Sequence, residues 1–413
     1  MLPEGWERVT VGEACAIKNN LRLPLNVEQR AELKGPYPYF GPTGVLDYID
    51  HYRIDEEFAV IGEDGDHFLK YRDKPMTLHF SGKANVNNHA HIVGASKHCS
   101  PKWFHYWFMH RDLTPALSRQ GVGRYKLTKK ALCDLEIWLP PQDEQLRISC
   151  ILSTWDDAIA ATERLRANCR RQKHSLLSIL LGMPASDPAA QDRSGAYPPS
   201  VQPGTPSLPP TPAGWTRTSL GKHLIEVRRP APLESSERYR LVTVKRSRGG
   251  VELRQTLTGR EIKTPTQFYV RNGDFLISKR QIVHGACGIV PPELDGAVVS
   301  NEYAVINTAG EIDLRFLRYL SESRYFQQTC FHSSIGVHVE KMIFKTERWL
   351  KWPFNVPPLP VQMRIVEVLD TARREVELIA AQIERLKQEK AALMADLLTG
   401  KRRVRVPFEG AAL

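Results

Sequence analysis

The sequence has few features of a membrane protein, a secreted protein or a disulfide-stabilised fold. It contains no run of about 18 apolar residues that would span a membrane, and no basic segment followed by an apolar one at its N-terminus. The 7 cysteines are odd in number and form no Cys-x-x-Cys pair, which favours free thiols in a reducing compartment. We therefore expect a cytoplasmic protein that does not bind membranes.

Motifs for nucleotide hydrolysis and base methylation are also missing. Gly82-Lys83-Ala84 lacks the upstream glycine and the hydroxyl of a phosphate-binding loop. Residues 355–359 contain a Pro-Pro pair, but no aromatic residue follows it as in the motif that holds a flipped base. We predict that this chain carries no catalytic residue.

Two clusters contain residue types that bind metals, at spacings that fit no common site. The first is made of His89, His91, His98 and Cys99. The second is made of Glu63, Asp64 and Asp66. The first matches no zinc motif, and the second lies in a Gly-Glu-Asp-Gly-Asp string typical of a turn, although carboxylates of metal nucleases are an alternative. We predict loop histidines, a turn and no metal site.

Positive charge is what the sequence has in excess. The formal net charge is +11 and the pI is about 9.3, which favours an acidic partner such as nucleic acid over a merely basic globular protein. A length of 413 residues with 42% hydrophobic and 25% charged residues indicates a globular protein of more than one domain.

The chain contains one pattern twice. Shifting residues 140–182 by 217 positions matches eleven residues of 43, among them both prolines of the Pro140-Pro141 pair. A second echo opens each half, because Gly5-Trp6-x-Arg8-x-x-x-Gly12 recurs at a shift of 209 from Gly214 onward. The chain is therefore a tandem of two units, each a globular stretch ending in a helix.

Both repeated helices carry an apolar seam. In the second copy the seam residues follow strict 3-4 spacing: Leu369, Ala372, Val376, Ile379, Ile383, Leu386, Lys390, Leu393 and Leu397. The first copy is weaker between Ile159 and Leu176. Because neither stripe would be stable alone, we expect the two helices to pair as a coiled coil, with Lys173 and Lys390 fixing the register or marking a docking position.

Between the repeats lies a proline-rich segment. Nine prolines fall between Pro184 and Pro212, which predicts an extended linker without packed structure. The globular stretches mix short β-branched and aromatic runs with Gly and Pro, so the fold class is α+β. The predicted domains are 1–139, a spacer helix at 140–182, the linker at 183–213, a second domain at 214–356, a second spacer helix at 357–400 and a basic tail at 401–413.

Each unit resembles a known family at the residues of this repeat. The opening Gly-Trp, the closing Pro-Pro-x-x-x-Gln-x-Arg-Ile at Pro357–Ile365 and the helix end at Leu397-Leu398-Thr399-Gly400 are similar to specificity subunits of type I restriction-modification systems. The resemblance covers nearly the whole chain, with Val361 departing from the Glu kept at Glu144. It implies two target recognition domains separated by two long helices in an antiparallel coiled coil.

The same resemblance implies the partners. Each domain would read one half of a split double-stranded DNA target, while the helices dock two methyltransferase subunits and the complex adds motor-nuclease subunits. S-adenosylmethionine, Mg and ATP would then be bound by those partners, and this chain would bind no cofactor. The residues assigned to partner docking and the spacer are Gln145, Arg147, Ile148, Lys173, Gln362, Arg364, Ile365 and Lys390.

Residues that contact DNA are predicted from their type and their place in loops. Arg, Lys and Gln read base edges or hold phosphates. In the first unit we select Lys70, Arg72, Lys74, Arg119, Gln120, Arg124 and Lys126. In the second we select Lys279, Arg280 and Gln281, together with Lys245, Arg246 and Arg248. The last three lie in a stretch from Arg228 to Arg260 that holds nine basic residues and three acidic ones. A solvated basic face is the alternative for this stretch.

Two other interpretations stay open at this point. One is a single-chain DNA methyltransferase or nuclease with disguised motifs, and the other is a coiled-coil adaptor without DNA binding. If the chain is a specificity subunit, a helix over residues 144–181 would be a rod of roughly 55 Å, longer than the ~34 Å between successive major-groove faces of DNA. We therefore hypothesise that helix length sets the gap between the two half-sites.

Overall fold

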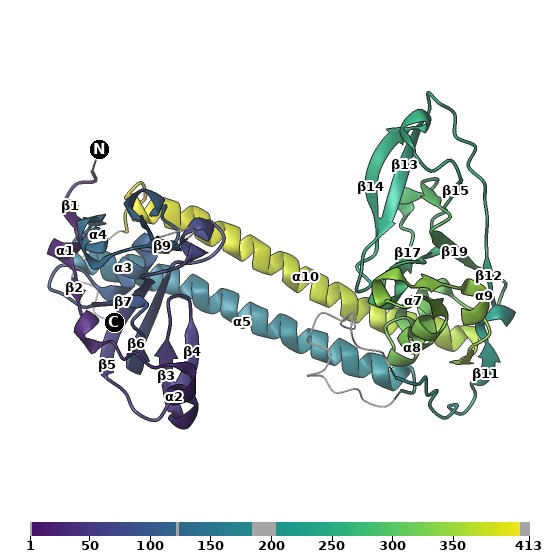
Figure 1. Ribbon diagram of the computed structural model, residues 1–413, viewed down its shortest axis with the longest axis horizontal. Helices are drawn as coiled ribbons and strands as arrows, with labels where there is room; N and C mark the ends of the chain where they lie inside the picture. Colours follow the sequence, from purple (N-terminus) through teal and green to yellow (C-terminus); the bar gives the residue numbers. More distant parts are fainter. Residues whose placement is uncertain (1, 121–123, 184–203, 405–413) are drawn as a thin grey trace, which may run out of the picture. The chain divides into compact units, whose positions relative to one another are not determined.

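The computed structural model describes residues 2–120, 124–183 and 204–404 (Figure 1). The chain divides into two compact units. Unit 1 consists of Met1–Glu163 and Gln382–Leu413, and unit 2 of Arg164–Ala381. Each unit combines strands with helices, which confirms the predicted α+β class. In the described residues no helix is long and apolar enough to cross a membrane.

Unit 1 is organised around a six-stranded sheet in the order β2-β7-β5-β6-β3-β4. The strands are β2 (Ala16–Ile17), β3 (Lys34–Phe40), β4 (Val45–Ile49), β5 (Ile54–Gly62), β6 (Thr77–Val86) and β7 (Ala90–Gly94). All neighbours are antiparallel except β3 and β6. β5 is buried from Phe58 to Gly62 because helix α3 (Pro101–Phe108), with its aromatic residues, packs on it. The N-terminus of α3 is fixed by the N-cap Ser100 and by Pro101.

A smaller group of elements closes unit 1 near the start of its long helix. β1 (Glu7–Thr10) pairs antiparallel with β10 (Glu136–Leu139), so the two ends of the first globular stretch meet. Unit 1 also contains α1 (Val11–Ala14), α2 (Val27–Glu32), β8 (Ser118–Gln120), β9 (Arg124–Lys126) and α4 (Lys129–Asp134).

Unit 2 repeats this plan with a different second layer. Its sheet β12-β19-β16-β17 corresponds to β2-β7-β5-β6, and a second sheet has the order β14-β13-β18-β15. The strands are β12 (Leu224–Glu226), β13 (Arg238–Val244), β14 (Val251–Thr258), β15 (Gln267–Tyr269), β16 (Phe275–Ser278), β17 (Cys287–Ile289), β18 (Val298–Ser300) and β19 (Tyr303–Thr308). In Figure 1, β13 and β14 stand out as a long two-stranded ribbon.

The closing elements of unit 2 match those of unit 1. β11 (Thr216–Ser219) pairs with β22 (Pro353–Val356) as β1 pairs with β10. The helices are α7 (Leu314–Leu320), α8 (Arg324–His332) and α9 (Thr346–Trp349), and a short hairpin is formed by β20 (Ser334–Ile335) and β21 (Ile343–Phe344). The similarity of the two units therefore extends well beyond the helical repeat that the sequence displays.

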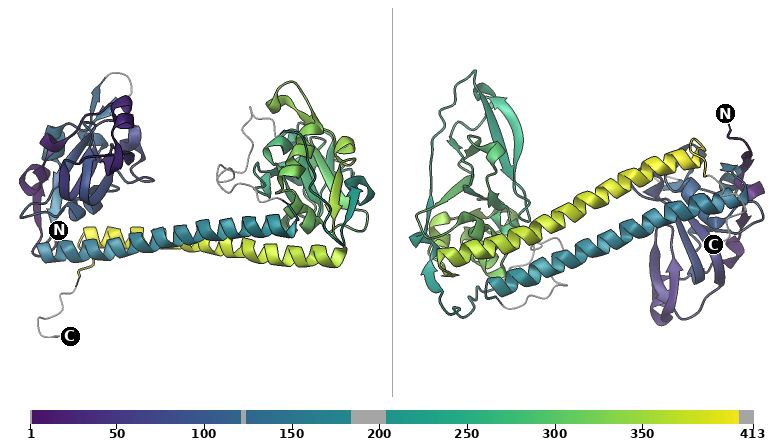
Figure 2. Two further views of the ribbon diagram at one scale, coloured as in Figure 1. Left: turned by 90° about the horizontal axis from the view of Figure 1, so that it is seen from below. Right: turned by 180° about the vertical axis from the view of Figure 1, so that it is seen from behind.

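Both predicted spacer helices are present and run antiparallel where they pair. α5 (Gln142–Leu180) has 39 residues and α10 (Leu359–Leu398) has 40, each about 60 Å long at 1.5 Å per residue. In unit 1 the start of α5 lies beside the end of α10, through ion pairs of Lys390 with Asp156 and Lys387 with Glu163. In unit 2 the end of α5 packs on the start of α10, with Leu177 in one core with Ile365. Figure 2 shows both helices from two further sides.

Part of the proline-rich linker differs from the prediction. Residues 184–203 lie outside the described residues, but within residues 204–213 the segment 209–211 is hydrogen-bonded to Asn355 in the globular part of unit 2. The Asn355 amide donates to the carbonyls of Pro209 and Pro210, and Thr211 donates to the Asn355 side chain. Proline carbonyls remain hydrogen-bond acceptors, so a buried asparagine fixes a segment whose composition alone predicts extended chain.

Candidate nucleic-acid interface and helix junctions

Loop cluster 1 in unit 1 consists of residues 63–76 and the hairpin β8–β9. Backbone hydrogen bonds join the two parts, from Leu127 to the Glu63 carbonyl at 2.8 Å and from Gly65 to the Tyr125 carbonyl at 3.1 Å. Gly65 has a φ of 133°, a conformation that an L side chain rarely adopts. Hydrogen bonds and a glycine therefore fix this loop on the end of β5.

A network of ion pairs stabilises loop cluster 1. The Glu63 carboxylate lies 2.8 Å from Arg22 Nη1 and 3.1 Å from Lys126 Nζ, and Asp64 lies 3.0 Å from His89 Nδ1. The hydrogen bond from Lys126 to Glu63 raises the pKa of Lys126. Burial lowers the pKa of His91, so this ring stays neutral at neutral pH while it hydrogen-bonds the Leu127 carbonyl. Two of the three carboxylates singled out in the sequence, Glu63 and Asp64, thus neutralise cations within the fold.

The predicted DNA-contacting residues of unit 1 gather at loop cluster 1, although their surroundings differ. Lys70, Arg72 and Lys74 are exposed on the loop. Arg119 is exposed and lies over the Tyr125 ring. Lys126 forms ion pairs with Glu63 and Asp64. Gln120 and Arg124 pair across the hairpin, but their side chains lie outside the described residues.

Loop cluster 2 in unit 2 consists of residues 245–250, 279–286 and 335–342. Phe344 donates to the Lys279 carbonyl at 2.8 Å, the counterpart of the Leu127 bond to Glu63. Ser247 and Arg248 have φ values of 54° and 58°, a strained conformation for non-glycine residues. Backbone bonds of 2.8 Å from Ser247 to His284 and from Arg248 to Gly285 impose it.

Of the six residues predicted to contact DNA in unit 2, three are exposed to solvent and three are partly buried. Lys245, Arg246 and Arg280 are exposed, each beside one surface carboxylate. Arg248 instead donates to the Ser321 carbonyl at 2.7 Å, and Lys279 contacts Glu226 at 3.2 Å. Gln281 is half-buried beneath the turn. Arg248 and Lys279 therefore stabilise the loops that present the other cations.

The β13–β14 ribbon carries further exposed cations. The register shifts between Leu241 and Val242, which leaves Arg254 as the extra residue of a β-bulge, a feature that redirects a side chain. Arg238 and Arg254 on the ribbon are exposed, and so are Arg260 and Lys263 just after it. Part of the basic stretch from Arg228 to Arg260 thus forms a strand pair, but the bulge has no sequence signal. Arg240 is held by the carbonyls of Glu293 and Asp295.

The residue types that suggested a metal do not converge. Within the described ranges, no group of three or more His, Cys, Asp or Glu side chains has the arrangement of a metal site. All seven cysteines have free thiols. His98 is exposed, and Cys99 is buried in the unit 1 core.

A buried glutamine joins each long helix to its globular region. The Gln145 amide donates to the carbonyls of His98 and Pro140 at 2.7 and 3.0 Å and accepts from the Ser100 N–H at 3.1 Å. In unit 2, Gln362 donates to Glu311 and Pro357 at 2.8 and 2.9 Å and accepts from the Asp313 N–H at 2.9 Å. Ser100 and Asp313 are the N-caps of α3 and α7. The Pro-Pro-x-x-x-Gln motif is therefore a structural clamp between helix and domain.

Four of the other six residues assigned to partner docking also have internal contacts. Ile148 and Ile365 are buried in the two cores. Lys390 contacts Asp156 at 2.5 Å and lies over the Tyr106 ring, while Lys173 contacts Glu322 at 2.8 Å and lies over the equivalent Tyr319 ring. Arg147 is half-buried and Arg364 is exposed. Sequence matching found the residues that hold the helices and missed the exposed apolar ones between them, such as Leu146 and Met363.

At the helix junction of unit 1, an arginine that follows α10 pairs with a buried carboxylate. Arg403 donates two hydrogen bonds of 2.8 and 2.9 Å to Glu144, which also accepts from the Trp6 indole at 3.1 Å. The Glu144 side chain is 8% exposed. Arg403 also donates to the Glu4 carbonyl, so this clasp ties the C-terminal segment to the N-terminal one.

Comparison with known proteins agrees with this architecture. Residues 3–168 match the family model of the type I restriction modification DNA specificity domain. A Haemophilus influenzae protein named as a type I restriction enzyme specificity subunit is 32% identical over 36% of this chain and 36% of its own length. The MjaVIII specificity subunit of Methanocaldococcus jannaschii is 22% identical over 98% of this chain and 94% of its own.

A solved structure shares the fold along almost the whole chain. The S subunit of a type I restriction-modification system from M. genitalium superposes with a TM-score of 0.58 at 11% identity, covering 96% of this chain and 97% of that one. The specificity-domain match, the full-length relative and the duplicated architecture with paired long helices lead to one conclusion. Residues 3–168 belong to the type I restriction modification DNA specificity domain family, and the chain as a whole resembles the specificity subunits of type I restriction-modification systems.

Proposed function

We propose that this chain is the non-catalytic DNA-reading subunit of a type I complex, with loop cluster 1 reading one half of a split target and loop cluster 2 the other. The observation that carries the proposal is the equivalent placement of exposed cations in the two units. In each, the loop after the central strand is bonded to a short hairpin, at Glu63 and Leu127 or at Lys279 and Phe344. Basic loops fixed on a rigid sheet suit phosphate and base contacts.

The chemistry would belong to partner chains. Methyl transfer needs S-adenosylmethionine, and a motor-nuclease needs Mg and ATP, which we assign to methyltransferase and restriction subunits. The cationic side chains of this chain that have internal partners, such as Arg22 and Lys126, neutralise carboxylates of the fold. The exposed ones bring positive charge to a polyanion, within a chain of net charge +11.

The test changes each loop cluster separately. Lys70→Ala, Arg72→Ala and Lys74→Ala together should weaken binding to one half-site, because removing one cation from a phosphate reduces the slope of log affinity against log salt by about 0.9. Lys245→Ala, Arg246→Ala and Arg280→Ala should weaken binding to the other half. Binding is measured by fluorescence anisotropy on duplexes with either half-site scrambled, across a salt series.

Matched controls remove the same charge elsewhere. Lys34, Lys97 and Lys130 in unit 1 and Arg217, Lys222 and Arg348 in unit 2 are exposed and lie outside the loop clusters. Their alanine variants should retain half-site discrimination. Equal losses of affinity in control and loop-cluster variants, or DNA methylation by the purified chain alone, would contradict the proposal.

Helix length as the determinant of the gap is a separate part of the proposal. Removing one heptad from both α5 and α10 shortens each helix by about 10 Å, roughly three base pairs of DNA. The reconstituted complex should then methylate a target with a correspondingly shorter gap. Methylation of the original gap by that variant would refute this part alone.

A further inference from the structure

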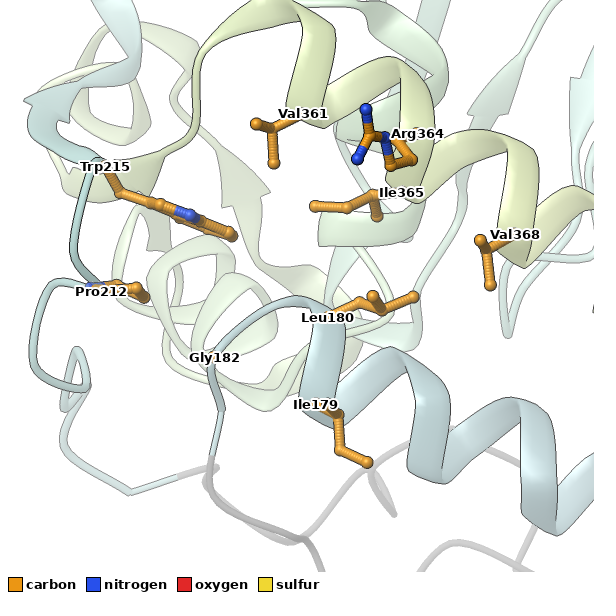
Figure 3. A pocket seen from close by; sticks show the side chains of 9 residues that line it. All are labelled: Ile179, Leu180, Gly182, Pro212, Trp215, Val361, Arg364, Ile365 and Val368. Carbon is orange, nitrogen blue, oxygen red and sulfur yellow. The ribbon is translucent and has the colours of Figure 1, made fainter.

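Unit 2 has an open apolar pocket at its helix junction (Figure 3). Its volume is about 350 Å³, which lies toward the lower end of the range of about 300–1,000 Å³ for ligand pockets. Trp215, Ile365 and Leu180 line it, with Ile179 and Val361 toward solvent. Arg364 is the one charged residue among those that line it. A second hollow along α5 shares Ile179, so the surface continues beyond the pocket.

The repeat places equivalent residues at the same junction of unit 1. At shifts of 217 and 209, Leu180, Ile365 and Trp215 correspond to Leu397, Ile148 and Trp6. Two positions change character, because Val361 corresponds to Glu144 and Ile179 to Asp396. In unit 1 the segment after α10 covers this place: Arg403 binds Glu144, Arg402 lies 4.0 Å from Asp396, and Val404 packs on the core.

The two junctions therefore differ both in charge and in the exposure of their tryptophan. Unit 1 has two carboxylates and two arginines that neutralise them, and its Trp6 is 5% exposed. Unit 2 has neither carboxylate, and its Trp215 remains partly exposed beside Val361, which is 40% exposed. The aromatic wall that the chain covers for itself in unit 1 is left open by the described residues of unit 2.

We propose that the unit 2 pocket is a docking site for an apolar side chain adjoining a carboxylate on the methyltransferase partner, and that the clasp makes the unit 1 junction the weaker site. The inference rests on the proposed function for the identity of the partner. An apolar wall favours an apolar anchor, and Arg364 at its rim favours a carboxylate next to that anchor.

Exposed apolar residues on the long helices show the same asymmetry. The α5 and α10 portions of unit 2 expose Leu165, Ile179, Leu359, Val361, Met363, Val368 and Leu378. Among the described large apolar residues of those helices in unit 1, Leu146 alone is exposed to this degree. Contiguous exposed apolar surface marks protein interaction sites. A second copy of this chain fits less well, because it would bring another +11 of net charge to Arg364.

The experiment titrates the full-length chain with the methyltransferase subunit of its own system by isothermal titration calorimetry. The wild type should show two sites that differ at least tenfold in dissociation constant. Val361→Glu with Ile179→Asp, which gives unit 2 the carboxylates of unit 1 without their arginines, should weaken the tighter site more than tenfold and leave the weaker one unchanged. Arg364→Gln should weaken the tighter site severalfold and reduce its salt dependence. Val27→Glu, at a residue 70% exposed outside the pocket, is the matched control.

Several results of this titration would contradict the proposed docking site in unit 2. Two equal sites, no binding by a folded wild type, or an undiminished tighter site in the double variant would overturn it. Sedimentation of the chain alone provides a further check, because self-association abolished by the double variant would identify a second copy as the occupant. Half-site DNA binding is measured on the same samples and should not change. A wild type without half-site specificity would refute the proposed function while leaving two unequal sites intact.

Discussion

Units 1 and 2 use the same clamp and close it in different ways. Gln145 and Gln362 make the same three hydrogen bonds to equivalent backbone groups, so the junction of helix and domain tolerates little change. Around this clamp, unit 1 has the Trp6–Glu144–Arg403 cluster and unit 2 has an open apolar wall. The hydrogen bonds that attach the long helix are therefore the same in both units, whereas the residues on the adjoining surface differ between them.

The largest effect should come from breaking the clamp. Gln145→Ala and Gln362→Ala each leave two carbonyls and one N–H without their partner, at a cost on the order of 3 kcal/mol in the free energy of unfolding. Hydrogen exchange followed by mass spectrometry should show reduced protection at α3 in the first variant and at α7 in the second. Similar losses of exchange protection at α3 and α7 would support the equivalence of the Gln145 and Gln362 clamps. A loss confined to one unit would contradict it.

Removal of the clasp should have a somewhat smaller effect. Arg403→Ala leaves the buried Glu144 carboxylate without its cation, and we expect a loss of about 2 kcal/mol, below the ~3–5 kcal/mol of a fully buried pair because Arg403 is half exposed. Glu144→Val with Arg403→Ala copies the residue of unit 2 and should recover much of that loss. Urea unfolding of the two single variants and the double variant gives the coupling. A coupling near zero would show that the ion pair does not stabilise unit 1.

Acid should weaken unit 1 more than unit 2. Burial lowers the pKa of His105 in α3 to about 3, whereas the equivalent position in α7 is Arg318. Between the folded pKa of His105 and ~6.5, the unfolded chain binds more protons than the folded one. The free energy of unfolding of unit 1 is therefore highest above pH ~6.5 and decreases as the pH falls. Between pH 6.5 and 5.5 the loss should be about 1 kcal/mol. Exchange protection of α3 relative to α7, corrected for intrinsic rates, measures it, and His105→Gln should remove the difference.

The smallest effect is expected at the strained turn of loop cluster 2. Ser247→Gly should raise the free energy of unfolding of unit 2 by up to about 1 kcal/mol, because glycine adopts a φ of 54° without steric cost. Thermal melts of this variant and of Ser235→Gly, at an exposed residue elsewhere in unit 2, separate relief of strain from a general glycine effect. A lower melting temperature for Ser247→Gly would mean that the serine side chain stabilises the turn.

The sequence predicted the long helices well because their period and repeat are local signals. The seam residues Leu369, Ile379, Ile383 and Leu397 are all buried, as 3-4 spacing implies. The role of Gln145 could not be predicted, because its partners His98 and Ser100 precede it by about 45 residues and carry no pattern. Repetition marked Gln145 and Lys173 as important, but repetition alone cannot distinguish an internal clamp from a surface contact.

The sequence allowed the basic loops of the two clusters to be located, but not the contacts that their individual side chains make. Basic character indicated Arg246 and Arg248 alike, yet two positive φ angles turn Arg248 toward the Ser321 carbonyl while Arg246 stays exposed. The change from Glu144 to Val361 was visible in the sequence. Its meaning depends on Arg403, a residue 259 positions from Glu144 that closes on it only in the folded chain.

The division of both long helices between the units has a consequence for synthesis on the ribosome. Unit 2 is one continuous stretch, Arg164–Ala381, whereas unit 1 needs Gln382–Leu413 in addition to Met1–Glu163. At about 5–20 residues per second, Met1–Glu163 must wait until all of unit 2 has been made before Leu397 and Leu398 can join Ile148 and Leu152 in the unit 1 core. Of the two units, the one whose synthesis starts earlier is therefore completed later, and a premature stop after Ala381 leaves unit 1 unfinished while unit 2 can already be whole.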